Sequence, residues 1–237
     1  MKALTLGLLL AAALAACSSA PPKPDWQGGA KSALDAAVQD TLLGESRAAA
    51  AEMGRARAEI GRTGDPALMA RAELVFCAAQ AAALAFGPCE GFERVRADAA
   101  PAELAYADHL EGKRLSPAQI DLLPASQRGA AQAVAQSAAP AVSTLQAIED
   151  PLSRLTACAV LFQAGQASPE VIALAGDVAS AQGWRRPLLA WLKVQASLAN
   201  KAGDAETAAR LGRRIRLAEE ATLPRAAAAS QASSAAR

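Results

Sequence analysis

The chain has few aromatic residues, and their scarcity limits the fold classes that it can adopt. Trp, Tyr and Phe together make up 3% of the 237 residues. Aromatic and β-branched residues are the ones that β-strands favour. Alanine, the best helix former, accounts for 66 residues instead. The composition therefore predicts an all-α protein in which helices approach one another closely.

The chain also lacks an excess of charge of either sign. Its formal net charge is +1, and removal of Lys2 with a leader segment would lower it to zero. A neutral chain has no overall field that attracts nucleic acid or an anionic surface. We therefore expect no nucleic-acid partner.

Motifs that mark enzymes and metal sites are absent from the sequence. There is no Gly-x-Ser-x-Gly, no His-Glu-x-x-His, no phosphate-binding loop and no Cys-x-x-Cys. The single histidine, His109, lies near a predicted helix end, and we interpret it as a surface capping residue rather than a general base. The sequence thus predicts no catalytic residue, no metal ligand and no cofactor.

The first residues have the layout of a secretory signal peptide. Lys2 is followed by the apolar run Ala3 to Ala13 and then by small residues before Cys17. This run is shorter than the roughly 20 residues that a transmembrane helix needs. Export is therefore expected, by cleavage within this region.

Leu14-Ala15-Ala16-Cys17 resembles the lipobox of bacterial lipoproteins. That resemblance implies cleavage before Cys17, acylation of Cys17 and attachment to a membrane through the N-terminal lipid. Because Ser18 stands where aspartate would retain a lipoprotein in the inner membrane, it implies the periplasmic face of the outer membrane. The alternative is ordinary secretion after an Ala-x-Ala site, which leaves Cys17 as a free thiol or removes it.

Composition shifts divide the chain into four parts. We expect a signal peptide over residues 1–16, a lipidated cysteine and proline-rich tether over 17–27, an all-α periplasmic domain over 28–221, and a disordered tail over 222–237. The tail contains mostly Ala, Ser and Gln and has no sizeable apolar residue beyond Pro224.

Four pairs of residues mark helix starts within the domain. They combine an N-capping side chain with proline at the first helical position: Asp65-Pro66, Ser116-Pro117, Asp150-Pro151 and Ser168-Pro169. Gly183 and Gly203 are typical of helix C-termini. These marks and the apolar periodicity predict about ten to twelve helices joined by short turns, with residues 89–149 the least regular.

Two predicted hairpins share one pattern. Ala37, Gly44-Glu45 and Ala49 in the first match Ala196, Gly203-Asp204 and Ala208 in the second. The pattern resembles the tetratricopeptide repeat, in which small residues let two antiparallel helices pack closely. Asp40 and Ala199 stand where that repeat usually has tyrosine, and Gly212 where it has a bulky apolar residue. The resemblance implies a tetratricopeptide-like α-superhelix, and an irregular helical bundle is the alternative.

A further resemblance is to uncharacterised proteobacterial lipoproteins. It is based on the lipobox, on Pro24-Asp25-Trp26 and on Gly183-Trp184. It implies an all-helical layout and no particular activity. Trp184 and Trp191 are seven residues apart and share a helix face, which we interpret as core packing.

Cysteines other than Cys17 indicate one disulfide. Three remain in an oxidising compartment, where disulfides persist, so they cannot all pair. Cys77 and Cys89 flank the Gly87-Pro88 turn, and we predict that they are bridged. A Cys77–Cys158 bridge is the alternative, although Cys158 lies in an apolar stripe typical of a buried thiol.

Charge is distributed unevenly between the two halves of the chain. Residues 18–120 carry 11 Lys and Arg against 14 Asp and Glu, whereas residues 121–237 carry 12 against 9. Basic residues concentrate near the C-terminus, and the candidate partner-binding residues are Arg185, Arg186, Arg210, Arg213 and Arg214. They would face an acidic partner or lipid head groups. The alternative is solubility together with complementation of a helix dipole, because Arg213, Arg214 and Arg216 lie near a predicted helix C-terminus.

These features together favour a membrane-anchored periplasmic protein-interaction module. It would be an adaptor or assembly factor in the cell envelope, without catalysis and with an envelope protein as partner. A regulator or enzyme acting on the cell wall is one alternative, and a carrier of a hydrophobic ligand is another. The sequence leaves the oligomeric state open.

Overall fold

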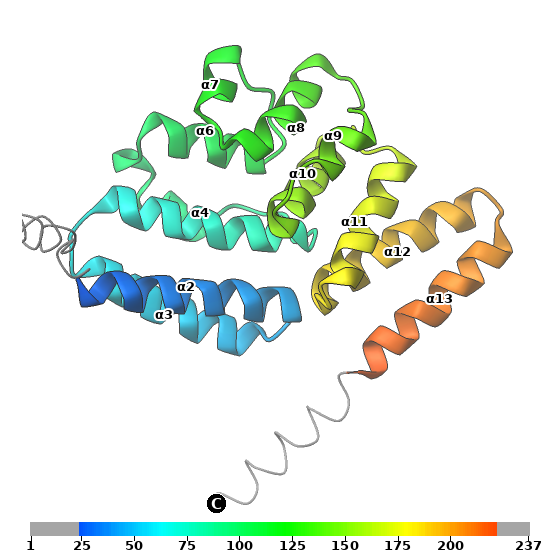
Figure 1. Cartoon of the computed structure of the whole chain (residues 1–237), viewed down its shortest axis with the longest axis horizontal. Helices are drawn as coiled ribbons and strands as arrows, with labels where there is room; N and C mark the ends of the chain where they lie inside the picture. The colour runs from blue at the N-terminus through cyan, green and yellow to red at the C-terminus, as the bar shows by residue number, and fades with distance from the viewer. Residues whose placement is uncertain (1–23, 222–237) are drawn as a thin grey trace, which may run out of the picture.

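The computed structural model describes residues 24–221, which form twelve α-helices and one 3₁₀-helix with no strand among them (Figure 1). The predicted all-α class is therefore confirmed. In chain order the elements are α2 (Asp25–Leu43), α3 (Ser46–Gly61), α4 (Pro66–Ala82), α5 (Glu90–Glu93), η1 (Arg96–Asp98), α6 (Pro101–Leu110), α7 (Pro117–Leu122), α8 (Ala125–Gln136), α9 (Val142–Gln146), α10 (Pro151–Gln163), α11 (Pro169–Ala181), α12 (Arg185–Lys201) and α13 (Ala205–Glu220).

Three predictions lie outside the described residues. They are the signal peptide over 1–16, the lipidation of Cys17 and the disordered tail over 222–237. Within residues 24–221, none of the helices has both the length and the apolar character that a bilayer crossing requires.

The first helix begins earlier than the predicted domain start at residue 28. α2 starts at Asp25, directly after the extended Pro24. Asp25 places a carboxylate in the first turn, where it complements the helix dipole. Trp26 packs against the α2–α3 core, which compensates for the poor helix formers Gly28 and Gly29. Residues 25–27, assigned to the tether from sequence, are thus helical.

All four predicted cap-and-proline starts are confirmed. Asp65 accepts hydrogen bonds from the backbone N–H groups of Ala67 and Leu68, at 2.8 and 3.2 Å. Ser116, Asp150 and Ser168 likewise accept from backbone N–H groups in the first turns of α7, α10 and α11. These caps fix the starts of helices that frame the core.

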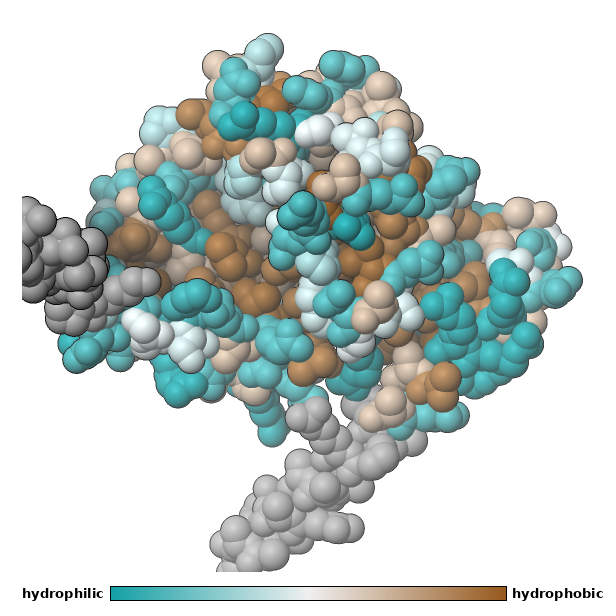
Figure 2. All heavy atoms as spheres, in the orientation of Figure 1, coloured by the Kyte–Doolittle hydropathy of each residue, from teal (hydrophilic) through white to brown (hydrophobic). Residues whose placement is uncertain are grey.

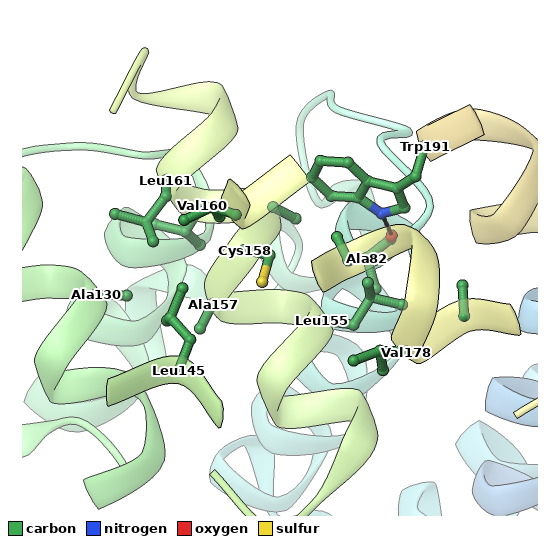
Figure 3. Packing of buried hydrophobic residues seen from close by; sticks show 14 of the residues in the cluster. Ala82, Ala130, Leu145, Leu155, Ala157, Cys158, Val160, Leu161, Val178 and Trp191 are labelled. Atoms are coloured by element: carbon green, nitrogen blue, oxygen red, sulfur yellow. Dashed lines mark hydrogen bonds between the residues drawn. The ribbon is translucent and has the colours of Figure 1, made fainter. Parts of the chain in front are cut away.

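Helix α10 lies at the centre of the molecule. Residues 155–161 are all buried, and α10 packs against α4, α8 and α11. A helix that is apolar all round has to be covered on every side. Cys158 lies in this core with no exposed surface (Figure 3), so the predicted buried thiol is confirmed, and burial raises its pKa to about 12.

Trp191 connects the C-terminal helices to the core. Its indole is fully buried, and Nε1 donates a hydrogen bond to the carbonyl oxygen of Ala82 at 3.0 Å (Figure 3). Trp184 is 8% exposed and belongs to the same apolar cluster. The interpretation of both tryptophans as core residues is confirmed.

The predicted disulfide is also confirmed. Cys77 in α4 and Cys89, just before α5, are bridged, with Cα atoms 5.9 Å apart. The chain turns back over Gly87-Pro88 between them, as the sequence suggested. Cys158 remains a free thiol.

Both predicted hairpins form. α2 packs against α3, and α12 packs against α13. The first hairpin lies along α4, whereas α13 packs extensively only against α12, at the edge of the molecule (Figure 1). The finer resemblance to tetratricopeptide repeats stays a prediction.

Candidate partner-binding groove

A groove of about 510 Å³ opens between α11, α12 and α13, and we call it the C-terminal groove. Its apolar lining includes Ile172, Leu198 and Leu211, and Leu198 is one of five large apolar residues that are exposed in the described part of the chain. Its polar lining comprises Gln195, Asp204, Thr207, Arg210 and Arg214. The groove therefore combines an apolar floor with a partly cationic rim.

The start of α13 orients the two arginines. Asp204 caps the helix by accepting a hydrogen bond from the backbone N–H of Thr207 at 2.9 Å. That bond, with a smaller contribution from the Arg210 charge, lowers the pKa of Asp204. Residues four apart lie on one helix face, so Arg210 and Arg214 both point along the groove beside the buried Leu211.

The arginines of α13 differ from most basic side chains of the N-terminal half. Arg57 makes a two-pronged ion pair with Glu73, at 2.5 and 2.9 Å, and Arg71 pairs with Glu103. In contrast, Arg210, Arg213 and Arg214 form no ion pair with any carboxylate in residues 24–221. Their charges remain available to an anionic partner.

The helix-dipole alternative does not account for these arginines. α13 ends at Glu220, and its last turn contains no basic residue. Arg213 and Arg214 lie six or more residues before that end, while the dipole effect falls off within the last turn. Their position is instead mid-helix, at and next to the groove.

Arg185 and Arg186 lie apart from the C-terminal groove. They begin α12, beside the end of α2 at Gly44. The Arg185 guanidinium donates two hydrogen bonds to the carbonyl oxygen of Leu43, from Nε at 3.1 Å and from Nη2 at 2.8 Å. Arg185 therefore satisfies the C-terminus of α2 and joins the two hairpins. The five candidate arginines do not form one continuous face.

His109 is not a surface residue, so its interpretation as a surface cap is wrong. The side chain is 1% exposed, and Nε2 lies 3.1 Å from Oε1 of Gln127, whose Nε2 donates to the Ser153 carbonyl. Burial lowers the pKa of His109 to about 4. The imidazole is thus neutral at pH 7 and joins α6, α8 and α10, because the core closes over the end of α6.

Sequence reasoning missed the apolar half of the groove. Ile172 and Leu198 stand in apolar helical sequence that predicts a helix but does not show which side chains remain uncovered, and Leu198 is 39% exposed. An apolar stripe on a helix does not show how far along that helix its neighbours extend to cover it. No cluster of three or more His, Cys, Asp or Glu side chains suited to a metal ion occurs within residues 24–221.

Comparison with known proteins returns no relative: no family model, no curated protein and no solved structure matches the chain. The site is therefore interpreted from its own geometry.

Proposed function

We propose that the protein is a lipid-anchored periplasmic interaction module, an adaptor or assembly factor at the inner face of the outer membrane. In this proposal the C-terminal groove binds an acidic, apolar segment of another envelope protein. The observation that carries it is the pairing of an open apolar groove with Arg210 and Arg214, which have no carboxylate partners in the described part of the chain.

The chemistry of the groove selects the kind of segment. Leu198 is 39% exposed and offers apolar surface, so a leucine- or phenylalanine-bearing segment would bury area there at about 25 cal/mol per Å². Guanidinium groups match carboxylates in a two-pronged geometry. Glutamate or aspartate next to the apolar residues of the partner would therefore fix its register and speed its association.

The proposed anchor would keep this groove near the membrane. With cleavage before Cys17, seven residues separate the acylated residue from the start of α2 at Pro24-Asp25. Fully extended, they span about 25 Å. The partner is accordingly expected to be an outer-membrane protein or a periplasmic protein that approaches that membrane.

Crosslinking in intact cells, followed by mass spectrometry, tests the proposal. We would compare the wild type, an unanchored Cys17→Ser chain, and a groove variant with Arg210→Glu and Arg214→Glu. The matched control reverses two exposed arginines outside the groove, Arg47→Glu and Arg94→Glu. We expect one envelope protein whose crosslinked acidic segment maps to α12 or α13.

That protein should be lost from the groove variant and retained by the control variant. Its loss from the Cys17→Ser chain would support the role of the anchor. Equal capture by the groove variant and the control would exclude the C-terminal groove as the binding face. The absence of any reproducible partner would overturn the adaptor function.

A further inference from the structure

A second groove, which we call the α4 groove, lies where α4, α6, α7 and the start of α8 meet. Its volume is about 540 Å³, within the range of small-molecule sites. The apolar lining includes Leu74, Val75, Tyr106, Leu122 and Leu123. Val75 and Leu122 are 41% and 45% exposed, so two of the five exposed large apolar residues within residues 24–221 lie in this one groove.

The α4 groove continues toward the first helix. A smaller apolar pocket of about 220 Å³, lined by Trp26, Leu34 and Ile60, shares Arg71 and Val75 with it. In the space-filling view, hydrophobic residues gather along α4 between the hydrophilic outer surfaces of α2 and α6 (Figure 2). The two pockets together form an elongated apolar surface, which suits a linear apolar chain better than a compact molecule.

One polar group in the groove lacks a partner. Glu103 is 6% exposed, and its Oε1 accepts a hydrogen bond from Arg71 Nε at 2.6 Å. Its Oε2 is buried and has no hydrogen-bond partner within the described residues. Buried polar atoms are nearly always satisfied, and an unpaired carboxylate oxygen is an especially costly exception. A ligand that donates a hydrogen bond beside Glu103 would remove that cost.

The charges of the groove indicate which donor fits. Arg71 and Glu103 neutralise each other as an ion pair. Arg128 also lines the groove, donates within residues 24–221 only to two backbone carbonyl oxygens, and leaves the groove with a net positive charge. An ammonium head would add a third cation to Arg71 and Arg128, and a carboxylate head has no hydrogen to donate to the free oxygen of Glu103. Tyr106 adds no charge, because burial raises its pKa to about 12. A neutral donor such as a hydroxyl group satisfies the free oxygen without adding a charge to the groove.

We propose that the α4 groove binds a single-chain amphiphile with an uncharged hydroxyl head, the alkyl chain lying along α4 and the hydroxyl donating to the Glu103 carboxylate. This site is separate from the C-terminal groove and does not depend on the proposed partner. The ligand class is that of a fatty alcohol or of the hydroxyl end of a monoacyl lipid.

Calorimetric titration with three probes of equal chain length tests the site: decanol, decylamine and decanoate, each below the concentration at which it self-associates. The full chain would carry Cys17→Ser, so that no attached acyl chain competes. We expect decanol to bind at least about tenfold more tightly than either charged probe, a ratio in keeping with one hydrogen bond to a charged acceptor.

Three variants locate the site. Glu103→Leu should weaken decanol binding about tenfold, because the acceptor is lost, and should reduce the preference over decanoate. Its partner Arg71 is largely exposed, so the fold should tolerate the change. Leu122→Gln should weaken all three probes, whereas the matched change of an exposed leucine in the other groove, Leu198→Gln, should weaken none.

Two results would overturn the proposal. One is equal binding of the three probes, which would indicate adhesion of alkyl chains without head-group recognition. The other is a preference for decanol that persists in Glu103→Leu. Neither result bears on the crosslinking outcome at the C-terminal groove, so the two proposals fail separately.

Discussion

The α2–α3 and α12–α13 hairpins turn in the same way. At Gly44 and at Gly203 the backbone is left-handed, with φ of 85° and 74°. The N–H of the next residue bonds back to a carbonyl five residues earlier, that of Asp40 or of Ala199. In α2–α3, Ala37, Met53 and Ala56 are completely buried, whereas Leu211 is the only buried residue of α13.

Neighbouring helices, rather than the hairpins themselves, account for this difference. α4 covers the open side of α2–α3, and no helix covers α13 to the same extent. The same kind of turn thus leads to a hairpin with several completely buried side chains in one place and to a hairpin with one buried side chain on its second helix in the other. Local sequence specifies the turn, and long-range packing decides how much of each hairpin is buried.

The largest expected effect is a loss of unfolding free energy when one buried side chain in each hairpin is truncated. Met53→Ala should lower the free energy of unfolding by about 3–5 kcal/mol, because its cavity is enclosed on all sides. Leu211→Ala should cost about 2 kcal/mol, because α13 can relax against α12 alone. Urea denaturation measures both values. Equal losses would mean that α13 is as constrained as α3, contrary to the comparison.

Acidification should lower the free energy of unfolding through the buried His109 and should not change the local stability of the α12–α13 hairpin. The folded-state pKa of His109 is about 4, below the usual 6.5, so the unfolded chain binds more protons between those values. Stability is then complete above pH 6.5 and declines as pH falls, by about 2 kcal/mol at pH 5. Denaturation at pH 7 and pH 5 measures this loss.

The control for the pH effect is His109→Leu. Whatever its own stability, this variant should lose most of the dependence between pH 7 and pH 5. An unchanged slope would assign the effect to other groups. Hydrogen exchange, corrected for pH, measures the local opening of α12–α13. The free energy of this opening should be the same at pH 7 and pH 5, since the chain's only histidine lies in α6.

The smallest expected effect is the difference in stability between alanine substitutions at the two turn glycines, Gly44 and Gly203. Alanine at either glycine costs about 1 kcal/mol, because its Cβ disfavours a left-handed backbone. At Gly44 a Cβ would also lie 3.1 Å from Nη2 of Arg185, whereas nothing lies within 4 Å at Gly203. We therefore expect Gly44→Ala to cost about 2 kcal/mol, since it also disturbs the bonds to Leu43.

Thermal unfolding of the two alanine variants measures this difference. Measured in an Arg185→Ala background, Gly44→Ala should cost only the backbone strain of about 1 kcal/mol, because the bonds to Leu43 are already absent. If Gly44→Ala and Gly203→Ala were equally destabilised, the added Cβ at residue 44 would leave the Arg185 bonds to Leu43 intact, contrary to the expectation.

Local chemistry explains what was predictable from sequence. The starts at Asp65-Pro66 and Asp150-Pro151 depend on contacts within four residues, so the caps could be placed. The Cys77–Cys89 bridge spans only 12 residues across an evident turn. These features require no knowledge of the tertiary arrangement.

Features that depend on distant segments were not predictable. The burial of His109 needs Gln127 and the carbonyl of Ser153, and the role of Arg185 needs the end of α2, 142 residues away. Both grooves exist because helices far apart in sequence leave a strip uncovered. A single sequence shows which helix faces are apolar, but it does not show which part of each face the neighbouring helices leave exposed.

The central position of α10 has a consequence for the order in which the protein folds. A chain that emerges N-terminus first presents α4 long before residues 151–163 are available to cover Ala79 and Ala82. Contacts between such distant segments form slowly, because a long loop has to close first. We therefore expect the part of α4 around Ala79 and Ala82 to stay uncovered until α10 has emerged, although the cluster between α2, α3 and α4 can form before it. Closure of the core waits for α10, and only then can α12 place Trp191 against the end of α4.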